Sequence, residues 1–103
     1  KHPLLADAVN EKGLACAGLN FPAAEWEKNT KEGMDNIPPY DLILWITSNF
    51  ETLDELRPHL EKLNLVGVAY DERTPLPTLH WIVTDKSGKS LVIEKTKEVP
   101  TKM

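Results

Sequence analysis

Two separate parts of the chain each hold two largely apolar segments on either side of a short polar turn. The first part covers about residues 4–20 and turns at Asn10 to Gly13, and the second covers about 79–95 and turns at Asp85 to Gly88. Asn or Asp suits the first position of a type I turn, and Gly suits the left-handed residue that closes a hairpin loop with a bulge. The pattern therefore predicts two β-hairpins.

The turn positions also predict which side chains share a face of each hairpin. In the second hairpin, the expected cross-strand pairs are Trp81–Ile93 and Val83–Leu91 on one face, and His80–Glu94 and Ile82–Val92 on the other. Since both faces hold apolar residues, we expect a sheet that is covered on both sides. One face of the first hairpin holds only short side chains, which lets a backbone or a ligand approach closely; they are Ala6, Ala8, Cys16, Gly18 and Asn20.

Between the hairpins, a first stretch of apolar residues recurs at helical spacing. Pro38 and Pro39 favour a helix start, because proline is tolerated in the first turn. The stripe that follows predicts a largely buried helix over about 39–49, and its members are Leu42, Trp45, Ile46, Asn49 and Phe50.

A second helix is predicted over about 53–63. It begins with a capping box from Thr52 to Glu55 and carries leucines on one face. Pro58 removes a backbone donor inside this helix, so we expect a kink or an early end. Residues 22–37 and 64–78 show no clear periodicity.

The predicted order of elements, ββααββ, defines an α+β fold rather than an α/β one. A chain of 103 residues with 41% hydrophobic and 27% charged residues fits one soluble domain, 1–103. The net charge of −4 argues against a nucleic-acid partner, which would require a basic face. No apolar run approaches the roughly 20 residues of a membrane span.

The residues alone indicate no complete active site. The only thiol, Cys16, lies mid-strand in an apolar setting, where a cysteine is usually buried and inert. The three histidines have no metal-ligand spacing, and we expect His80 to bond to Glu94. Asn20 is the one polar residue that stands out by position. It ends a strand just before Pro22, where an Asn commonly starts a turn.

Two long motifs, residues 7–22 and 79–90, nevertheless closely resemble segments of the choloylglycine hydrolase family. Two shorter stretches between them, 42–45 and 61–66, are also similar to the family, in the same order and with similar spacing. The family contains bile-salt hydrolases and penicillin V acylases. The resemblance implies an N-terminal-nucleophile hydrolase, an αββα sandwich that needs no cofactor, in which a cysteine at the mature N-terminus attacks the amide and its own α-amino group is the base.

The resemblance also implies roles for individual residues. Asn20 matches a position that contributes to the oxyanion hole, and Asn rather than Tyr there favours conjugated bile salts over penicillin V as substrates. Ala6, Tyr70 and Thr74 are expected near the apolar body of the substrate.

The chain departs from the family at its start, where Lys1 stands instead of the nucleophilic cysteine. We therefore expect an internal fragment that is inactive alone, from a parent expected in the cytoplasm. A missing second sheet would leave one sheet face bare, either that of Ile82 and Val92 or that of Trp81 and Ile93, and drive homo-oligomer formation. A penicillin V acylase parent and a non-catalytic interaction domain remain alternatives.

Overall fold

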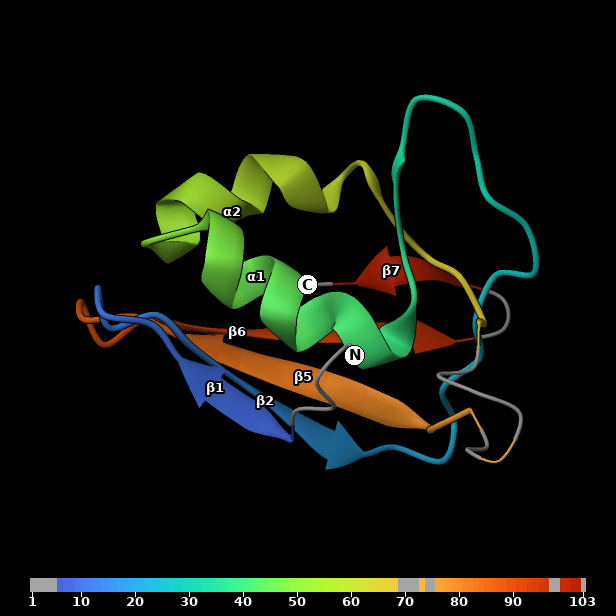
Figure 1. Cartoon of the computed structure of the whole chain (residues 1–103), viewed down its shortest axis with the longest axis horizontal. Coiled ribbons are helices and arrows are strands. Elements are labelled where there is room, and N and C mark those ends of the chain that lie inside the picture. Colours follow the sequence, from blue (N-terminus) through green and yellow to red (C-terminus); the bar gives the residue numbers. More distant parts are fainter. Residues whose placement is uncertain (1–5, 69–72, 74–75, 97–98, 103) are drawn as a thin grey trace.

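The computed structural model describes residues 6–68, 73, 76–96 and the backbone of 99–102. Its main sheet has five antiparallel strands in the order β1-β2-β5-β6-β7, and two helices lie on one face (Figure 1). The strands are β1 (Asp7–Val9), β2 (Ala15–Asn20), β5 (Leu79–Thr84), β6 (Ser90–Thr96) and β7 (Val99–Lys102). Both predicted hairpins are confirmed, and β7 was not predicted.

The two hairpin turns have the geometry that the sequence predicts. Gly13 and Gly88 adopt left-handed φ angles of 91° and 86°. The Gly13 N–H donates to the Asn10 carbonyl at 3.0 Å, and the Gly88 N–H donates to the Asp85 carbonyl at 3.1 Å. A side chain other than glycine would be strained at either position, so the turn sequence fixes the register of each hairpin.

All four predicted cross-strand pairs of the second hairpin are confirmed. Three are paired in the strand register, Trp81 with Ile93, Val83 with Leu91, and Ile82 with Val92, and His80 contacts Glu94 through its side chain. Trp81, Val83 and Ile93 are fully buried, whereas Val92 is 37% exposed. The helices therefore cover the face of Trp81 and Ile93, and the face of Ile82 and Val92 is the bare one.

The first predicted helix begins as a 3-10 turn, η1 (Pro39–Asp41), and continues as α1 (Leu42–Asn49). The second is α2 (Leu53–Leu60), capped by the Thr52 hydroxyl, which accepts from the Glu55 N–H at 3.2 Å. It ends three residues earlier than predicted. Pro58 lies inside α2, and Leu63 begins a strand instead of extending the leucine face.

A small parallel pair of strands lies outside the main sheet and was not predicted. It joins β3 (Asp35–Ile37) to β4 (Leu63–Leu65). All three residues of β4 are buried, so the strand shows no alternation of apolar and polar positions. Asn64 is held there because its amide donates to the Asn36 side chain at 2.8 Å and to the Asn29 carbonyl at 3.1 Å.

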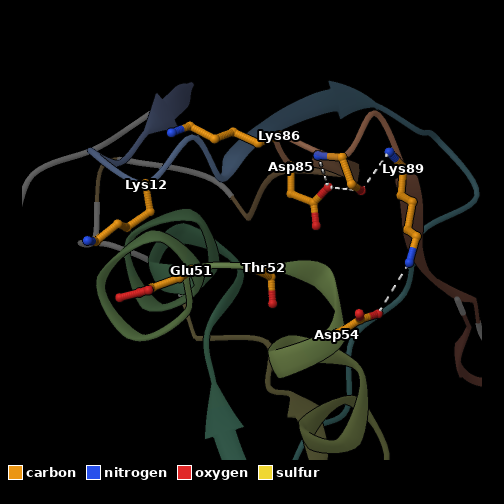
Figure 2. A pocket seen from close by; sticks show the side chains of 8 residues that line it. Lys12, Glu51, Thr52, Asp54, Asp85, Lys86 and Lys89 are labelled. Carbon is orange, nitrogen blue, oxygen red and sulfur yellow. Dashed lines mark hydrogen bonds and ion pairs between the residues drawn. The ribbon is translucent and has the colours of Figure 1, made fainter.

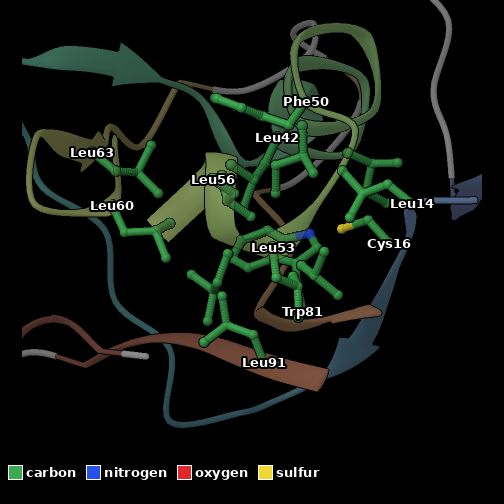
Figure 3. Close-up of a cluster of buried hydrophobic side chains, with 14 of the residues drawn as sticks. Leu14, Cys16, Leu42, Phe50, Leu53, Leu56, Leu60, Leu63, Trp81 and Leu91 are labelled. Carbon is green, nitrogen blue, oxygen red and sulfur yellow. The ribbon is translucent and has the colours of Figure 1, made fainter. Parts of the chain in front are cut away.

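The core lies between the helices and the sheet (Figure 3). Its fully buried members include Leu14, Leu42, Ile46, Leu53, Leu56, Leu65, Trp81, Val83 and Ile93. Cys16 and Gly18 of β2 face this layer. A Cβ added to Gly18 would lie 3.4 Å from the Trp81 Nε1, so the indole and not a ligand occupies the space beside that glycine. Burial of these side chains supplies most of the driving force for folding.

The two hairpin turns also hold the two helices at their ends. The Asn10 Nδ2 donates to the carbonyls of Thr47 and Phe50, at 3.0 and 2.7 Å, at the carboxyl end of α1. The Asp85 Oδ2 accepts from the Leu53 N–H at 2.9 Å, at the amino end of α2. Each side chain thus supplies the group that its helix end lacks, a donor for free carbonyls and an acceptor for a free N–H. The bond from the Leu53 N–H is the main cause that lowers the pKa of Asp85.

Among the described residues, one lysine is buried in the sheet. Lys95 follows Leu91 and Ile93 on the covered face of β6 and is 4% exposed. Its ammonium lies 2.9 Å from the Glu27 carboxylate and donates to the Thr96 carbonyl at 2.7 Å. The bond from Lys95 lowers the pKa of Glu27. This ion pair ties the loop around Glu27 to the main sheet.

Candidate functional site

Asn20, the candidate oxyanion residue, is the last residue of β2 and pairs with Leu79 of β5. It is exposed, and within the described part of the chain its side-chain amide has no hydrogen-bond partner. An amide donor that is free at the end of a rigid strand is available to a ligand.

The backbone N–H of Asn20 has a defined direction. The Gly18 N–H donates to the Ala6 carbonyl at 3.0 Å, and the Phe21 N–H donates to the Thr78 carbonyl at 2.8 Å. Because N–H groups along a strand alternate between its two neighbours, the Asn20 N–H points to the β1 side, like that of Gly18. Asn20 therefore offers a side-chain donor at one end of the sheet, and its backbone N–H is directed toward the β1 side.

Of the three residues predicted to contact substrate, the structure describes only Ala6. It is exposed, precedes β1 and lies beside Gly18, so it shares the sheet end of Asn20. Tyr70 and Thr74 fall outside the described residues. Of the residues expected near the substrate, the structure thus places Ala6 at the same end of the sheet as Asn20.

The residue after Asn20 makes a contact that the sequence reasoning missed. The Phe21 ring stacks on the His80 imidazole, with centroids 4.8 Å apart and planes inclined by 4°. The His80 Nδ1 lies 3.3 Å from the Glu94 Oε2, which confirms the predicted pairing of these two residues. The signal that could have revealed the stack is register, because Phe21 and His80 fall on the same face of neighbouring strands.

Cys16 has the inert setting that the sequence predicted. It is 1% exposed, and burial raises the pKa of its thiol to about 12. The thiolate is the nucleophilic form of cysteine, so this residue is not a nucleophile at neutral pH.

A charged hollow of about 350 Å³ lies where the hairpin turns meet the start of α2 (Figure 2). Three of its six charged side chains, those of Asp54, Asp85 and Lys89, make ionic or hydrogen-bond contacts. The Lys89 ammonium lies 3.7 Å from the Asp54 carboxylate, and Asp85 binds the Leu53 and Ser87 N–H groups. The arrangement joins the turns to α2 and presents no nucleophile or base in a water-excluded setting.

A second hollow, of about 440 Å³, lies on the bare face of the sheet. It is lined by mainly apolar side chains, including those of Val9, Ala15, Ala17, Leu19 and Ile82. In the described part of the chain, no cluster of three or more potential metal ligands occurs, and no helix is long and apolar enough to cross a membrane.

Comparison with known proteins places the chain in a family. Residues 1–101 match the model of the linear amide C–N hydrolases, choloylglycine hydrolase family. The chain is 46% identical over 98 residues to a bile salt hydrolase/transferase of Clostridium perfringens, and 45% identical over 98 residues to one of Lactiplantibacillus plantarum. Each alignment covers 94% of this chain and 30% of the relative. The chain belongs to the choloylglycine hydrolase family and spans about 30% of the length of these relatives.

Solved structures agree with this assignment. A crystal structure of a conjugated bile acid hydrolase variant from Clostridium perfringens matches 98% of this chain and 31% of its own, with a TM-score of 0.92 and 44% identity. A penicillin V acylase from Agrobacterium tumefaciens matches 94% of this chain and 28% of its own, with a TM-score of 0.67 and 24% identity, which shows the fold alone. The α+β fold predicted from the sequence is confirmed.

Proposed function

We propose that these 103 residues are the central part of a hydrolase domain that cleaves the amide bond of conjugated bile salts. The observation that carries the proposal is the exposed Asn20 amide, free among the described residues, at the end of β2 in a chain so similar to bile salt hydrolase/transferases. Since the chain spans about 30% of these relatives, the proposal concerns the complete protein.

Asn20 is proposed to stabilise the oxyanion. Attack on an amide carbonyl places negative charge on its oxygen, and N–H donors fixed beforehand around that oxygen lower the barrier. Asn20 provides such a donor from its side chain, at a position fixed by the pairing of β2 with β5. The family resemblance implies Asn at this position in enzymes that act on bile salts and Tyr in penicillin V acylases, so Asn20 supports a bile-salt substrate.

The apolar body of the substrate is proposed to lie near Ala6, with Tyr70 and Thr74 completing the wall. Steroid rings bind mainly through burial of apolar surface, and a small side chain beside Asn20 leaves room for them. The exposed position of Ala6 at the same end of the sheet supports this placement.

The nucleophile is proposed to lie outside these residues. The buried Cys16, with its pKa near 12, cannot serve. In an N-terminal cysteine, the thiol can give its proton at neutral pH to the residue's own α-amino group, which has a pKa of about 8. We therefore expect the isolated chain to be inactive.

A penicillin V acylase is the second candidate. A penicillin V acylase of Pectobacterium atrosepticum is 36% identical over 93 residues, which cover 85% of this chain and 24% of that protein. A non-catalytic interaction domain on the same scaffold is the third candidate, and the absence of any amidase activity in the complete protein would favour it.

The test is steady-state hydrolysis by the complete protein that contains this chain. Release of glycine from glycocholate and of taurine from taurocholate is compared with release of 6-aminopenicillanic acid from penicillin V. We expect the higher kcat/KM for a bile salt. A clear preference for penicillin V would overturn the interpretation of Asn20 and favour the second candidate.

A pair of variants tests the role of Asn20 within that assay. Asn20→Ala removes the side-chain donor, and loss of one oxyanion donor lowers kcat by about 100-fold or more when that donor contacts the oxyanion. Asn49→Ala removes a similarly exposed amide at the end of α1 and should keep wild-type kcat. Equal kcat values for the two variants would exclude the side-chain amide as the donor and leave only the backbone N–H.

A further inference from the structure

We propose that Phe21, His80 and Glu94 form an aromatic brace that positions the donors of Asn20 for catalysis. The inference rests on the proposed role of Asn20 in amide hydrolysis. None of the three side chains is proposed to touch the substrate, so they are positioning residues, and they act through the peptide that joins Asn20 to Phe21.

The brace begins with the ring stack. Leu19 pairs with His80, so their side chains share the bare face of the sheet, and alternation returns Phe21 to that face after Asn20. Phe21 and His80 are therefore diagonal neighbours on adjacent strands, within the reach of aromatic side chains. The centroid separation of 4.8 Å and the 4° inclination describe a parallel stack.

A carboxylate on the third strand fixes the imidazole. The Glu94 Oε2 lies 3.3 Å from the His80 Nδ1, and the two side chains are 36% and 24% exposed. Rotation of the imidazole about its χ angles would break this contact. The brace thus runs across three strands, from Phe21 on the β2 side to Glu94 on β6, and holds the ring plane on which Phe21 rests.

Two backbone features make the brace effective at Asn20. Pro22 restricts Phe21 to extended conformations, and the Phe21 N–H is bonded to the Thr78 carbonyl at 2.8 Å. The peptide after Asn20 is therefore held by a hydrogen bond along the sheet and by a ring stack on its bare face. With that peptide fixed, the side chain of Asn20 must project to the opposite face.

Loss of the stack should affect the chemical step more than substrate binding. An oxyanion donor acts when charge develops on the carbonyl oxygen, so its misplacement lowers kcat and leaves KM nearly unchanged. A displacement of about 1 Å in a catalytic group can cost about 100-fold in rate, and we expect a loss of about 10- to 100-fold.

The test measures kcat and KM for glycocholate with variants of the complete protein. Phe21→Leu removes the flat ring and should lower kcat. Phe21→Tyr keeps the stack and should have a kcat close to that of the wild type. Val92→Ala removes apolar surface from the same sheet face without touching the stack. This control should lower the thermal midpoint and keep wild-type kcat. A wild-type kcat in Phe21→Leu, or a kcat in Phe21→Tyr as low as in Phe21→Leu, would overturn the proposal.

Amide hydrogen exchange separates failure of the brace from failure of the proposed function. It is measured by mass spectrometry on peptides that span residues 18–24 and needs no activity. The backbone N–H of residue 21 should exchange faster in Phe21→Leu than in the wild type or in Val92→Ala. If the wild type hydrolysed no bile salt, the proposed function would fail, and unchanged exchange in Phe21→Leu would by itself overturn the brace.

Discussion

Asn10 joins the first hairpin turn to the end of α1, and replacing it by Asp tests whether that contact holds the helix on the sheet. The amide of Asn10 donates two bonds to α1 carbonyls, and its oxygen accepts from the N–H groups of Lys12 and Leu14 at 3.0 and 3.1 Å. Asn10→Asp has nearly the same shape. It keeps the two acceptor contacts of the turn and removes only the two donors.

The expected cost follows from those two bonds. A buried or partly buried hydrogen bond contributes about 0.5–1.5 kcal/mol, so the pair contributes about 1–3 kcal/mol. A carboxylate beside the carbonyls of a helix end adds an unfavourable dipole interaction of about 0.3–1 kcal/mol. The free energy of unfolding should therefore fall by about 1.3–4 kcal/mol at neutral pH.

The assay is urea unfolding followed by tryptophan fluorescence. Asn49→Asp is the matched control, because it places the same charge at the same helix end and replaces one exposed bond from Asn49 to the Trp45 carbonyl. The control should lose less stability than Asn10→Asp. In acid, the new carboxyl at position 10 regains a proton that it can donate to the α1 carbonyls. The loss should therefore be greatest at neutral pH and shrink as the pH falls.

Equal losses in the two variants would refute the reasoning, because they would show that charge at the helix end, and not the pair of bonds from Asn10, determines stability. A loss in Asn10→Asp that did not change with pH would also contradict it.

Four further predictions follow from contacts of single residues. The folded pKa of Asp85 is lowered, so its contribution to the free energy of unfolding is present above about pH 4 and lost as the pH falls through the folded pKa. Asp85→Asn should therefore lower the urea midpoint at pH 7 and match the wild type in acid. The side chain of Lys95 is 5% exposed and that of Glu27 is 32% exposed. Glu27→Gln leaves a buried ammonium without its charged partner, whereas Lys95→Met leaves a carboxylate that water can reach, so Glu27→Gln should be the more destabilising variant in urea unfolding. Iodoacetamide at pH 8 should label Cys16 only after unfolding, and rapid labelling of the folded chain would contradict its high pKa. Sedimentation should show the isolated chain as a dimer or larger species, and Ile82→Lys on the bare face should yield monomers.

Much of the fold could be predicted from the sequence because local chemistry determines it. The Asn and Gly residues of one turn, and the Asp and Gly residues of the other, fix both hairpins and their registers, which are confirmed. The Thr52 cap and the proline start locate both helices. The capping box differs in one detail, since the Glu55 carboxylate accepts from the Glu51 N–H instead of from the cap residue itself.

The elements that were missed depend on distant partners. The strands β3 and β4 have three residues each, and burial of every β4 residue erases the alternation that reveals a strand. The helix contacts of Asn10 and Asp85 join residues 32 to 40 positions apart, so the turn motifs gave no sign of them. Lys95 is buried because it continues the apolar alternation of β6, and the Glu27 that pairs with it lies on an irregular loop.

The site residues stay a prediction, and the structure adds only where the described ones lie. The resemblance indicated Asn20 and Ala6, and the structure brings both to one end of the sheet. It did not indicate that Phe21 would stack on His80, because such a contact follows from the pairing of β2 with β5 and not from either segment alone.

The most direct test of the central claim is the site and mass of the covalent intermediate. The complete protein is mixed with glycocholate or penicillin V, quenched with acid and analysed by intact mass and peptide mapping. We expect a choloyl adduct on a cysteine outside residues 1–103, with Cys16 unmodified. A choloyl group on Cys16, or an adduct that forms with penicillin V and not with glycocholate, would contradict the account.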